Sequence, residues 1–101
     1  MQGKIAVGNV VLNRVQDKNY PNTIYGVIFD RKYGTQFSPV IDGSIYQTPL
    51  GDSVIAAKRA LNGEVMVGAC LYFLNPKTAQ NNWIIRNRPY YTTIQNHDFY
   101  L

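Results

Sequence analysis

The sequence predicts an α+β fold, in which helices come first and a short antiparallel sheet follows. Helical periodicity dominates the first two-thirds of the chain, whereas the apolar runs near its end are short and bounded by turn residues, as strands are. The predicted order is helix, helix, loop-rich segment, helix, strand, strand, without the strand–helix alternation that builds a parallel sheet. With 101 residues, 46% of them apolar, the chain has the length for one core. We therefore expect a single domain over residues 1–101.

The first predicted helix covers Gln2–Val15, and its apolar residues spread round most of the helix circumference. Only Asn9, Asn13 and Arg14 form a polar strip. Such a helix needs neighbours on most sides, yet no Ser, Thr or Asp precedes it as a cap. We therefore expect an element before the first residue. Without that element, we expect an uncovered face on Ile5–Val15 and self-association of the chain through it.

A short second helix is predicted at Ile24–Phe29, after a turn that contains a proline. Asn22 or Thr23 can cap it, because either side chain accepts a hydrogen bond from an N–H of the first helical turn. The next segment, Arg31–Thr48, combines aromatic residues with two glycines and a proline. This composition predicts a loop-rich, partly extended segment.

The third predicted helix covers Ser53–Leu61, and residues 51–53 (Gly-Asp-Ser) are expected to cap it. Val54, Ala57 and Leu61 fall on one helical stripe and are expected to face the core. Asn62 and the glycine after it provide the C-terminal stop.

Two strands are predicted in the last third of the chain. Ala69–Leu74 is an apolar run ended by an Asn-Pro pair, and Ile94–Leu101 is the final strand. Cys70 lies within the first run, in the apolar sequence GACLYFLN, which is typical of a buried structural thiol.

Ten basic and six acidic residues give a net charge of +4, and the basic residues are scattered along the chain. A slightly basic, solvated surface explains this pattern, and attraction to an anionic polymer such as a cell wall is the alternative. Nucleic-acid binding would need a clustered basic stripe or a known motif, which the sequence lacks. One cysteine and one histidine make no zinc site, so we expect no metal and no cofactor. The sequence shows no signal peptide and no apolar run of the ~20 residues that span a bilayer, so we expect no membrane insertion.

Three stretches together resemble the catalytic domain of the spore cortex-lytic enzymes, the SleB-type cell-wall hydrolases. They are IAVGNVVLNRVQDKNYPNTIYGVIF (5–29), QFSPVIDGSIYQTP (36–49), and ALNGEVMVGACLYFLNPKTAQNNWIIRNRP (60–89) with NHDFY (96–100). Five family elements have counterparts here in the same order and at similar spacing, and they cover essentially the whole chain.

This resemblance implies a lysozyme-like domain that cleaves the glycan strands of peptidoglycan between muramic acid and glucosamine. It implies a muramidase or lytic transglycosylase, acting in the spore, the cell wall or outside the cell during cortex degradation and germination. In the family one Glu protonates the leaving oxygen, which requires a carboxyl group kept protonated in a partly apolar cleft. That Glu lies in a helix just before the counterpart of the first helix here. Residues 2–4 (Gln-Gly-Lys) match the end of the family stretch, so the resemblance implies that the catalytic Glu precedes Met1.

The six carboxylates of the chain offer no clear replacement for that acid. Glu64 follows a helix stop and is expected to be solvated, and Asp52 is expected to cap a helix. Asp17 and Asp30 are placed at helix ends. Asp42 is the one that lies within a family motif: it either forms an Asp-Gly turn or serves as the fallback catalytic acid.

Sugar-binding grooves combine aromatic rings for the pyranose faces with amides and hydroxyls for the ring substituents. We expect these roles for eight residues of the matched stretches: Gln36, Phe37, Ser38, Asp42, Tyr46, Tyr72, Asn75 and Trp83. For Phe37 and Trp83 the alternative is core packing, since large aromatic residues are usually buried. His97 is expected to be a hydrogen-bonded structural residue, with a proton shuttle as the alternative. A peptidoglycan-binding module without catalysis is the alternative function.

Overall fold

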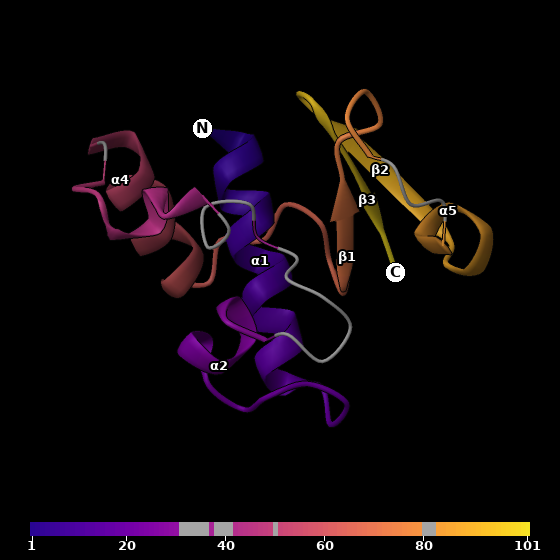
Figure 1. The fold of residues 1–101 in the computed structure, drawn as a ribbon, viewed down its shortest axis with the longest axis horizontal. Helices are drawn as coiled ribbons and strands as arrows, with labels where there is room; N and C mark the ends of the chain where they lie inside the picture. The colour runs from indigo at the N-terminus through magenta and orange to yellow at the C-terminus, as the bar shows by residue number, and fades with distance from the viewer. Residues whose placement is uncertain (31–36, 38–41, 50, 80–82) are drawn as a thin grey trace.

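Helix α1 (Gln2–Gln16) runs through the middle of the molecule and contacts most of the other elements (Figure 1). Helix α4 (Gly51–Leu61) packs along one side of it, a three-stranded sheet lies on the opposite side, and the short α2 (Ile24–Ile28) packs against it as well. This computed structural model describes residues 1–30, 37, 42–49, 51–79 and 83–101. Much of the predicted loop-rich segment therefore lies outside the described residues, as do Gln36 and Ser38.

The first two helices agree closely with the sequence prediction. Helix α1 begins after Met1, whose side chain makes no capping hydrogen bond. Thr23 rather than Asn22 caps α2, because its Oγ1 accepts a hydrogen bond from the Gly26 N–H at 3.0 Å. A 3-10 turn, η1 (Ser44–Tyr46), follows within the matched middle stretch.

The described C-terminal third holds more secondary structure than the sequence predicted. Its elements are β1 (Tyr72–Leu74), α5 (Trp83–Asn87), β2 (Tyr90–Ile94) and β3 (His97–Tyr100). The sheet is antiparallel with strand order β1-β3-β2. The predicted single strand Ile94–Leu101 was wrong in extent, since the region is a hairpin. Its turn contains Gln95 at a φ of 54°, a left-handed conformation that a glutamine does not signal in a sequence.

Strand β1 is shorter than the predicted Ala69–Leu74. Gly68 has a φ of 51°, and the Cys70 N–H donates to the Val67 carbonyl in a turn. The Asn13 Nδ2 group then donates to the carbonyls of both Gly68 and Cys70, at 2.9 Å each. These carbonyls are therefore satisfied by a helix side chain rather than by a neighbouring strand.

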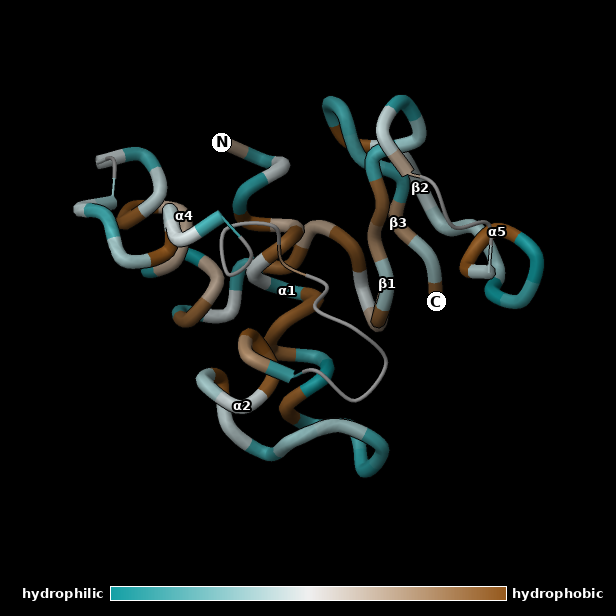
Figure 2. The backbone as a smooth tube through the Cα atoms, viewed as in Figure 1, coloured by the Kyte–Doolittle hydropathy of each residue, from teal (hydrophilic) through white to brown (hydrophobic). Residues whose placement is uncertain are grey.

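The core has two parts, one on each side of α1. Val10, Cys70 and Phe99 belong to the cluster between α1 and the sheet, and Ile5 and Ala60 belong to the cluster between α1 and α4. Hydrophobic residues concentrate along α1 and along the segment that leads into β1 (Figure 2). Cys70 is buried as predicted, and burial raises the pKa of its thiol to about 11.

The predicted core stripe of α4 is wrong. Val54, Ala57 and Leu61 are exposed, and the buried residues are Ala56 and Ala60. The reason is the close approach of the two helices: a Cβ added to Gly8 of α1 would lie 3.1 Å from the Cβ of Ala60. At this distance only small residues fit between the helices, so the larger apolar side chains lie at the rim.

The expected uncovered face of α1 is also largely absent. Ile5, Ala6, Val10 and Val11 are all buried by the sheet and the other helices. Self-association through this face is therefore not supported by its exposure. None of the helices in the described ranges is long and apolar enough to cross a membrane.

Candidate functional site

Arg14 is the centre of a cluster of aromatic residues at the C-terminal end of α1. Only 3% of it is exposed, and its Nε donates to the Leu71 carbonyl at 2.7 Å. The guanidinium carbon lies 4.9 Å from the ring centroid of Tyr20, 5.6 Å from that of Tyr72 and 6.0 Å from that of Phe37. These distances are typical of cation–π contacts. One buried cation thus joins three aromatic residues from three segments of the chain.

The electrostatics of Arg14 follow from this burial. Desolvation lowers the pKa of its guanidinium below the ordinary value, while Tyr20, Tyr72 and Asp30 act in the opposite direction. An arginine pKa is so high that the group stays charged throughout the physiological range. The cluster is therefore built round a permanent positive charge.

Tyr20 and Tyr72 both lie against the Arg14 guanidinium. Burial first, and then interaction of its hydroxyl with Tyr72, raises the pKa of Tyr20 well above its ordinary value. The hydroxyl therefore stays neutral over the physiological pH range, and it keeps the ability both to donate and to accept hydrogen bonds.

Tyr72 has two further neighbours, Arg88 and Trp83. The guanidinium carbon of Arg88 lies 4.8 Å from the Tyr72 ring centroid, and the Trp83 ring lies 5.9 Å from it. Nε and Nη2 of Arg88 donate to the Leu101 carbonyl at 3.1 and 2.6 Å, which fixes the guanidinium in place. Trp83 is 50% exposed, so the cluster reaches the protein surface at this residue.

A shallow depression lies next to this cluster, on the Leu71 side. It is lined by Asn13, Gln16, Asp17, Ala69 and Leu71. These side chains combine amides and a carboxylate with a small apolar floor, a composition that suits a polar ligand with one apolar face.

The structure brings some of the predicted sugar-binding residues together and separates others. Phe37, Tyr72 and Trp83 all belong to the Arg14 cluster, and Phe37 also lies 5.7 Å from the Phe73 ring. Tyr46 is 79% exposed on η1, where its ring lies 6.4 Å from that of Phe29. It therefore belongs to a different part of the surface.

The side chains of two other predicted residues, Asn75 and Asp42, are hydrogen-bonded to the backbone two residues further on. Oδ1 of Asn75 accepts a hydrogen bond from the Lys77 N–H at 3.0 Å, and Oδ1 of Asp42 accepts one from the Ser44 N–H at 2.8 Å. Both are turns of the kind that Asn and Asp commonly form. For Asp42, this is the Asp-Gly turn that the sequence offered as the alternative to catalysis.

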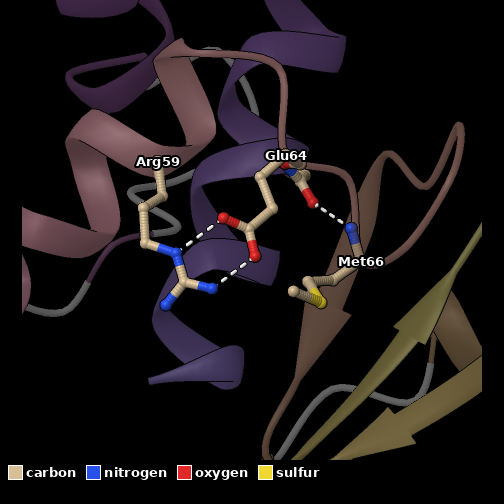
Figure 3. A network of polar contacts seen from close by, with 4 residues as sticks. Arg59, Glu64 and Met66 are labelled. Atoms are coloured by element: carbon tan, nitrogen blue, oxygen red, sulfur yellow. Dashed lines mark hydrogen bonds and ion pairs between the residues drawn. The ribbon is translucent and has the colours of Figure 1, made fainter.

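The pKa values of Asp42 and Glu64 are both lowered, whereas a general acid needs a raised pKa. Hydrogen bonds from Ser44 lower the pKa of Asp42, and Arg59 lowers the pKa of Glu64. Glu64 is not simply solvated as predicted, because it forms an ion pair with Arg59, in which Arg59 Nε donates to Oε2 at 2.6 Å (Figure 3). Both groups are therefore held in their ionised form.

The remaining candidates have structural contacts. Oδ1 of Asp17 accepts a hydrogen bond from the Asn19 N–H at the end of α1, as the helix-end assignment predicted. The prediction that Asp52 caps a helix was wrong, because α4 begins one residue earlier and Asp52 is an exposed residue of its first turn. The His97 ring packs 5.7 Å from the Phe73 ring and 6.5 Å from the Phe99 ring, which is compatible with the expected structural role. In the described part of the chain, no group of three His, Cys, Asp or Glu side chains could hold a metal ion.

Sequence reasoning missed Arg14, Arg88 and Tyr20. Arg14 and Arg88 were counted as scattered surface charge, although Arg14 lies in a largely apolar helix, beside Asn9 and Asn13. An arginine in such a setting is rarely buried without partners, so its position was the available signal. Its carbonyl partner comes from a residue 57 positions away, which the sequence pattern does not identify.

Comparison with known proteins agrees with this architecture. The family model described as Cell Wall Hydrolase matches residues 1–100. A spore cortex-lytic enzyme of Bacillus cereus (strain ATCC 14579) is 42% identical over 97 residues, which are 96% of this chain and 36% of that protein. The enzyme of the same name from Bacillus subtilis (strain 168) is 37% identical over 98 residues, 97% of this chain and 31% of that protein. The chain thus spans about a third of the length of these curated relatives.

Two solved structures share the fold. The catalytic domain of the germination-specific lytic transglycosylase SleB from Bacillus anthracis superposes with a TM-score of 0.89 at 41% identity, covering 99% of this chain and 79% of that one. The catalytic domain of Bacillus cereus SleB gives a TM-score of 0.86 at 41% identity, with 99% and 75% covered. These likenesses confirm the predicted α+β, lysozyme-like fold class and the predicted resemblance. The chain belongs to the cell wall hydrolase family.

Proposed function

We propose that the protein takes part in cleaving the glycan strands of peptidoglycan, as a lytic transglycosylase or muramidase acting on spore cortex or cell wall. The observation that carries this proposal is the match, over 99% of the chain, to the catalytic domain of a germination-specific lytic transglycosylase.

The Arg14 cluster supplies groups suited to a glycan strand. The half-exposed Trp83 ring and the Tyr72 ring offer apolar faces for pyranose rings. The neutral Tyr20 hydroxyl offers a hydrogen bond to ring substituents. Arg14 contacts the rings of Tyr20 and Tyr72 and helps to hold them in position, which reduces the entropy lost when a ligand binds.

The bond-cleaving step needs a carboxyl group that is protonated near neutral pH. Asp42 and Glu64 have lowered pKa values, which makes them unsuitable as proton donors. We propose that the acid is the Glu which the resemblance places before Met1. This Glu would lie beyond the N-terminal end of α1, where Gln95 of the β2–β3 turn packs against Gly3 (Figure 1).

In the proposed reaction this Glu donates its proton to the glycosidic oxygen, and the bond from that oxygen to the muramic acid C1 breaks. In the lytic outcome the muramic acid 6-hydroxyl then bonds to C1 and returns a proton to the carboxylate, which leaves a 1,6-anhydro ring. In the hydrolytic outcome a water molecule takes the place of that hydroxyl. The products therefore distinguish the two reactions by their sugar ends.

The experiment compares the 101-residue chain with a version that begins further upstream in the same reading frame. Both are incubated with purified spore-cortex peptidoglycan, and the soluble fragments are separated and identified by mass spectrometry. We expect release of anhydro-muropeptides by the longer version, and a loss of at least a hundredfold when its Glu is changed to Gln, since a positioned acid contributes roughly 10²–10⁴-fold.

Two outcomes would overturn parts of this proposal. Cleavage by the 101-residue chain that is abolished by Asp42→Asn would make Asp42 the acid. Binding of peptidoglycan by both versions without any cleavage would favour the peptidoglycan-binding module, which is the alternative function.

A further inference from the structure

We propose that Tyr72, Trp83, Arg86 and Arg88 form an anchoring site for a carboxylate-bearing part of a glycan, remote from the bond that is cleaved. The proposal rests on the proposed function for the identity of the ligand as peptidoglycan. It adds that the ligand's negative charge is recognised, and that recognition occurs at the end of α1 opposite to the proposed acid.

The aromatic part of this site lies on one face of the sheet, with exposed rings at its two ends and the buried Tyr100 between them. Tyr72 of β1 and Tyr90 of β2 are both paired with Tyr100 of β3, so the three side chains lie on the same face. The Tyr90 ring lies 5.7 Å from the Tyr100 ring, and Trp83 lies on the other side, against Tyr72. Tyr90 and Trp83 are each about half exposed. A row of rings that reaches the surface at both ends can contact more than one sugar.

The positive part of the site comes from two arginines near these rings. Arg88 is held over Tyr72 by its two hydrogen bonds to the Leu101 carbonyl, so its position is fixed before any ligand binds. Arg86 is exposed on α5 three residues after Trp83, which places both on one side of the helix. A guanidinium group binds carboxylates with two parallel hydrogen bonds.

Few negative charges oppose these arginines. Residues 83–95 contain no Asp or Glu, so α5 and β2 are without acidic side chains. Asp98 of β3 accepts a hydrogen bond from the Thr93 hydroxyl at 2.6 Å, further along the sheet. A carboxylate is therefore favoured at the α5 end of the aromatic row and disfavoured at the Thr93 end. Peptidoglycan carries such groups on its lactyl ethers and peptide stems, whereas chitin-type glycans carry none.

The distance between the two ends of α1 makes this site a remote one. Arg14, which contacts Tyr72, follows Gln2 by 12 residues in a continuous helix. At a rise of about 1.5 Å per residue these positions are about 18 Å apart. A strand bound at both ends of α1 would span several sugars, so short fragments should occupy only one of the two sites.

The single tryptophan of the chain provides a direct measurement of this site. We would titrate the 101-residue chain with a peptidoglycan tetrasaccharide that carries its carboxylates, and with the uncharged N-acetylglucosamine tetramer. The acidic fragment is expected to change the Trp83 emission and to bind more weakly as salt is added, since salt screens exposed charges. Arg86→Gln should weaken its binding about tenfold, the size of effect expected for one charge-assisted hydrogen bond. Lys77→Gln, which removes an exposed charge elsewhere, should leave the binding unchanged.

A second pair of variants tests the aromatic part by sedimentation with insoluble peptidoglycan. Trp83→Ala should lose most binding and Trp83→Phe should retain part of it. Ile85→Ala is the matched control, because Ile85 lies on the same helix and is also 50% exposed. Circular dichroism establishes that each variant is folded.

Two results would overturn the proposal. The first is equal binding of both tetrasaccharides together with no effect of Arg86→Gln on binding. The second is peptidoglycan binding that leaves the Trp83 emission unchanged, together with equal binding by Trp83→Ala and Ile85→Ala. Failure of the proposed function is a separate observation: the upstream-extended version would release no fragments although Trp83 responds to the acidic tetrasaccharide.

Discussion

The two faces of α1 are held in the molecule by different kinds of contact. The face towards α4 is apolar and built from small residues, with Gly8 against Ala60. The other face adds to its apolar contacts with the sheet a polar set, Asn9, Asn13 and Arg14, whose side chains bind backbone groups between residues 64 and 71. Apolar packing has no preferred direction, whereas hydrogen bonds specify which atoms meet. The polar face therefore fixes the position of the segment that ends at the candidate site.

The polar side chains of α1 supply hydrogen bonds that residues 64–71 lack for most of their length, because this segment is not paired with a strand there. Its carbonyls would otherwise be buried without donors, which is costly. Asn9 satisfies Glu64, Asn13 satisfies Gly68 and Cys70, and Arg14 satisfies Leu71. Among the described residues no buried side-chain nitrogen or oxygen lacks a partner. If this comparison is correct, changes on the polar face should affect both stability and the site, and changes on the α4 face should affect stability alone.

Loss of Arg14 should have the largest effect. Arg14→Ala leaves the Leu71 carbonyl without its donor and removes the cation from among Tyr20, Tyr72 and Phe37. We expect the free energy of unfolding to fall by about 3 kcal/mol, from a charged hydrogen bond and desolvated cation–π contacts. Urea denaturation measures this loss, and the Trp83 emission of the folded fraction should change as Tyr72 moves.

The Arg14→Lys variant separates the contribution of charge from that of stacking. Lysine keeps the charge but not the planar group that stacks on rings. An intermediate loss would support the stacking, whereas a lysine variant as stable as the original protein would show that charge alone suffices.

Asn9→Ala should have the second largest effect. Its Nδ2 donates to the Glu64 carbonyl at 2.9 Å and its Oδ1 accepts from the Met66 N–H at 2.7 Å. The side chain is buried, so two backbone groups lose their partners in the variant. We expect a loss of about 2 kcal/mol in thermal or urea denaturation. Asn13 is less buried, and Asn13→Ala should cost less; the reverse order would contradict the importance of burial here.

The sequence predicted those elements that depend on local pattern. The largely apolar helix α1 and the cap of α2, predicted at Asn22 or Thr23, are properties of a few neighbouring residues. The structure confirms the helix and identifies Thr23 as the cap. The stripe of α4 was wrong because it depends on Gly8, which lies on another helix. The β2–β3 hairpin was missed because its turn uses Gln95 in place of the glycine that normally signals a left-handed residue.

The residues of the candidate site also differ in whether local sequence could predict them. Tyr72, Trp83 and Phe37 were proposed as sugar-binding groups from their chemistry and their matched stretches, and the structure brings them to one cluster. Arg14, which holds them together, was missed because burial is a property of the folded chain. Apart from Tyr20, its partners are residues 37, 71 and 72, which are distant from it in sequence, and no local pattern identifies them.

A change on the α4 face should have a smaller effect that is confined to stability. Gly8→Val places a Cβ about 3 Å from the Cβ of Ala60, so the helices must separate slightly. We expect a loss of about 1.5 kcal/mol, typical of overpacking at a close contact. Ala60→Gly in the same protein should recover part of it, and this recovery in a double-mutant cycle is the control. Trp83 fluorescence and glycan binding should stay as in the original protein; a change in either would contradict the separation of the two faces.

The ion pair of Glu64 and Arg59 should have the smallest effect, although it lies beside Asn9. Arg59 lowers the pKa of the Glu64 carboxyl, so the folded state favours the ionised form. Its stabilisation is present above the ordinary Glu pKa and is lost as the pH falls through the lowered pKa of the folded state. Because both side chains are substantially exposed, 43% for Arg59 and 33% for Glu64, water and salt screen the pair. Glu64→Gln should therefore remove only a slight pH dependence from urea denaturation measured between neutral and acidic pH, and Arg59→Gln should remove the same one. A greater loss of stability for Glu64→Gln than for Asn9→Ala at neutral pH would contradict this order, and it would mean that the surface ion pair, rather than the buried amide, holds residues 64–66 against α1.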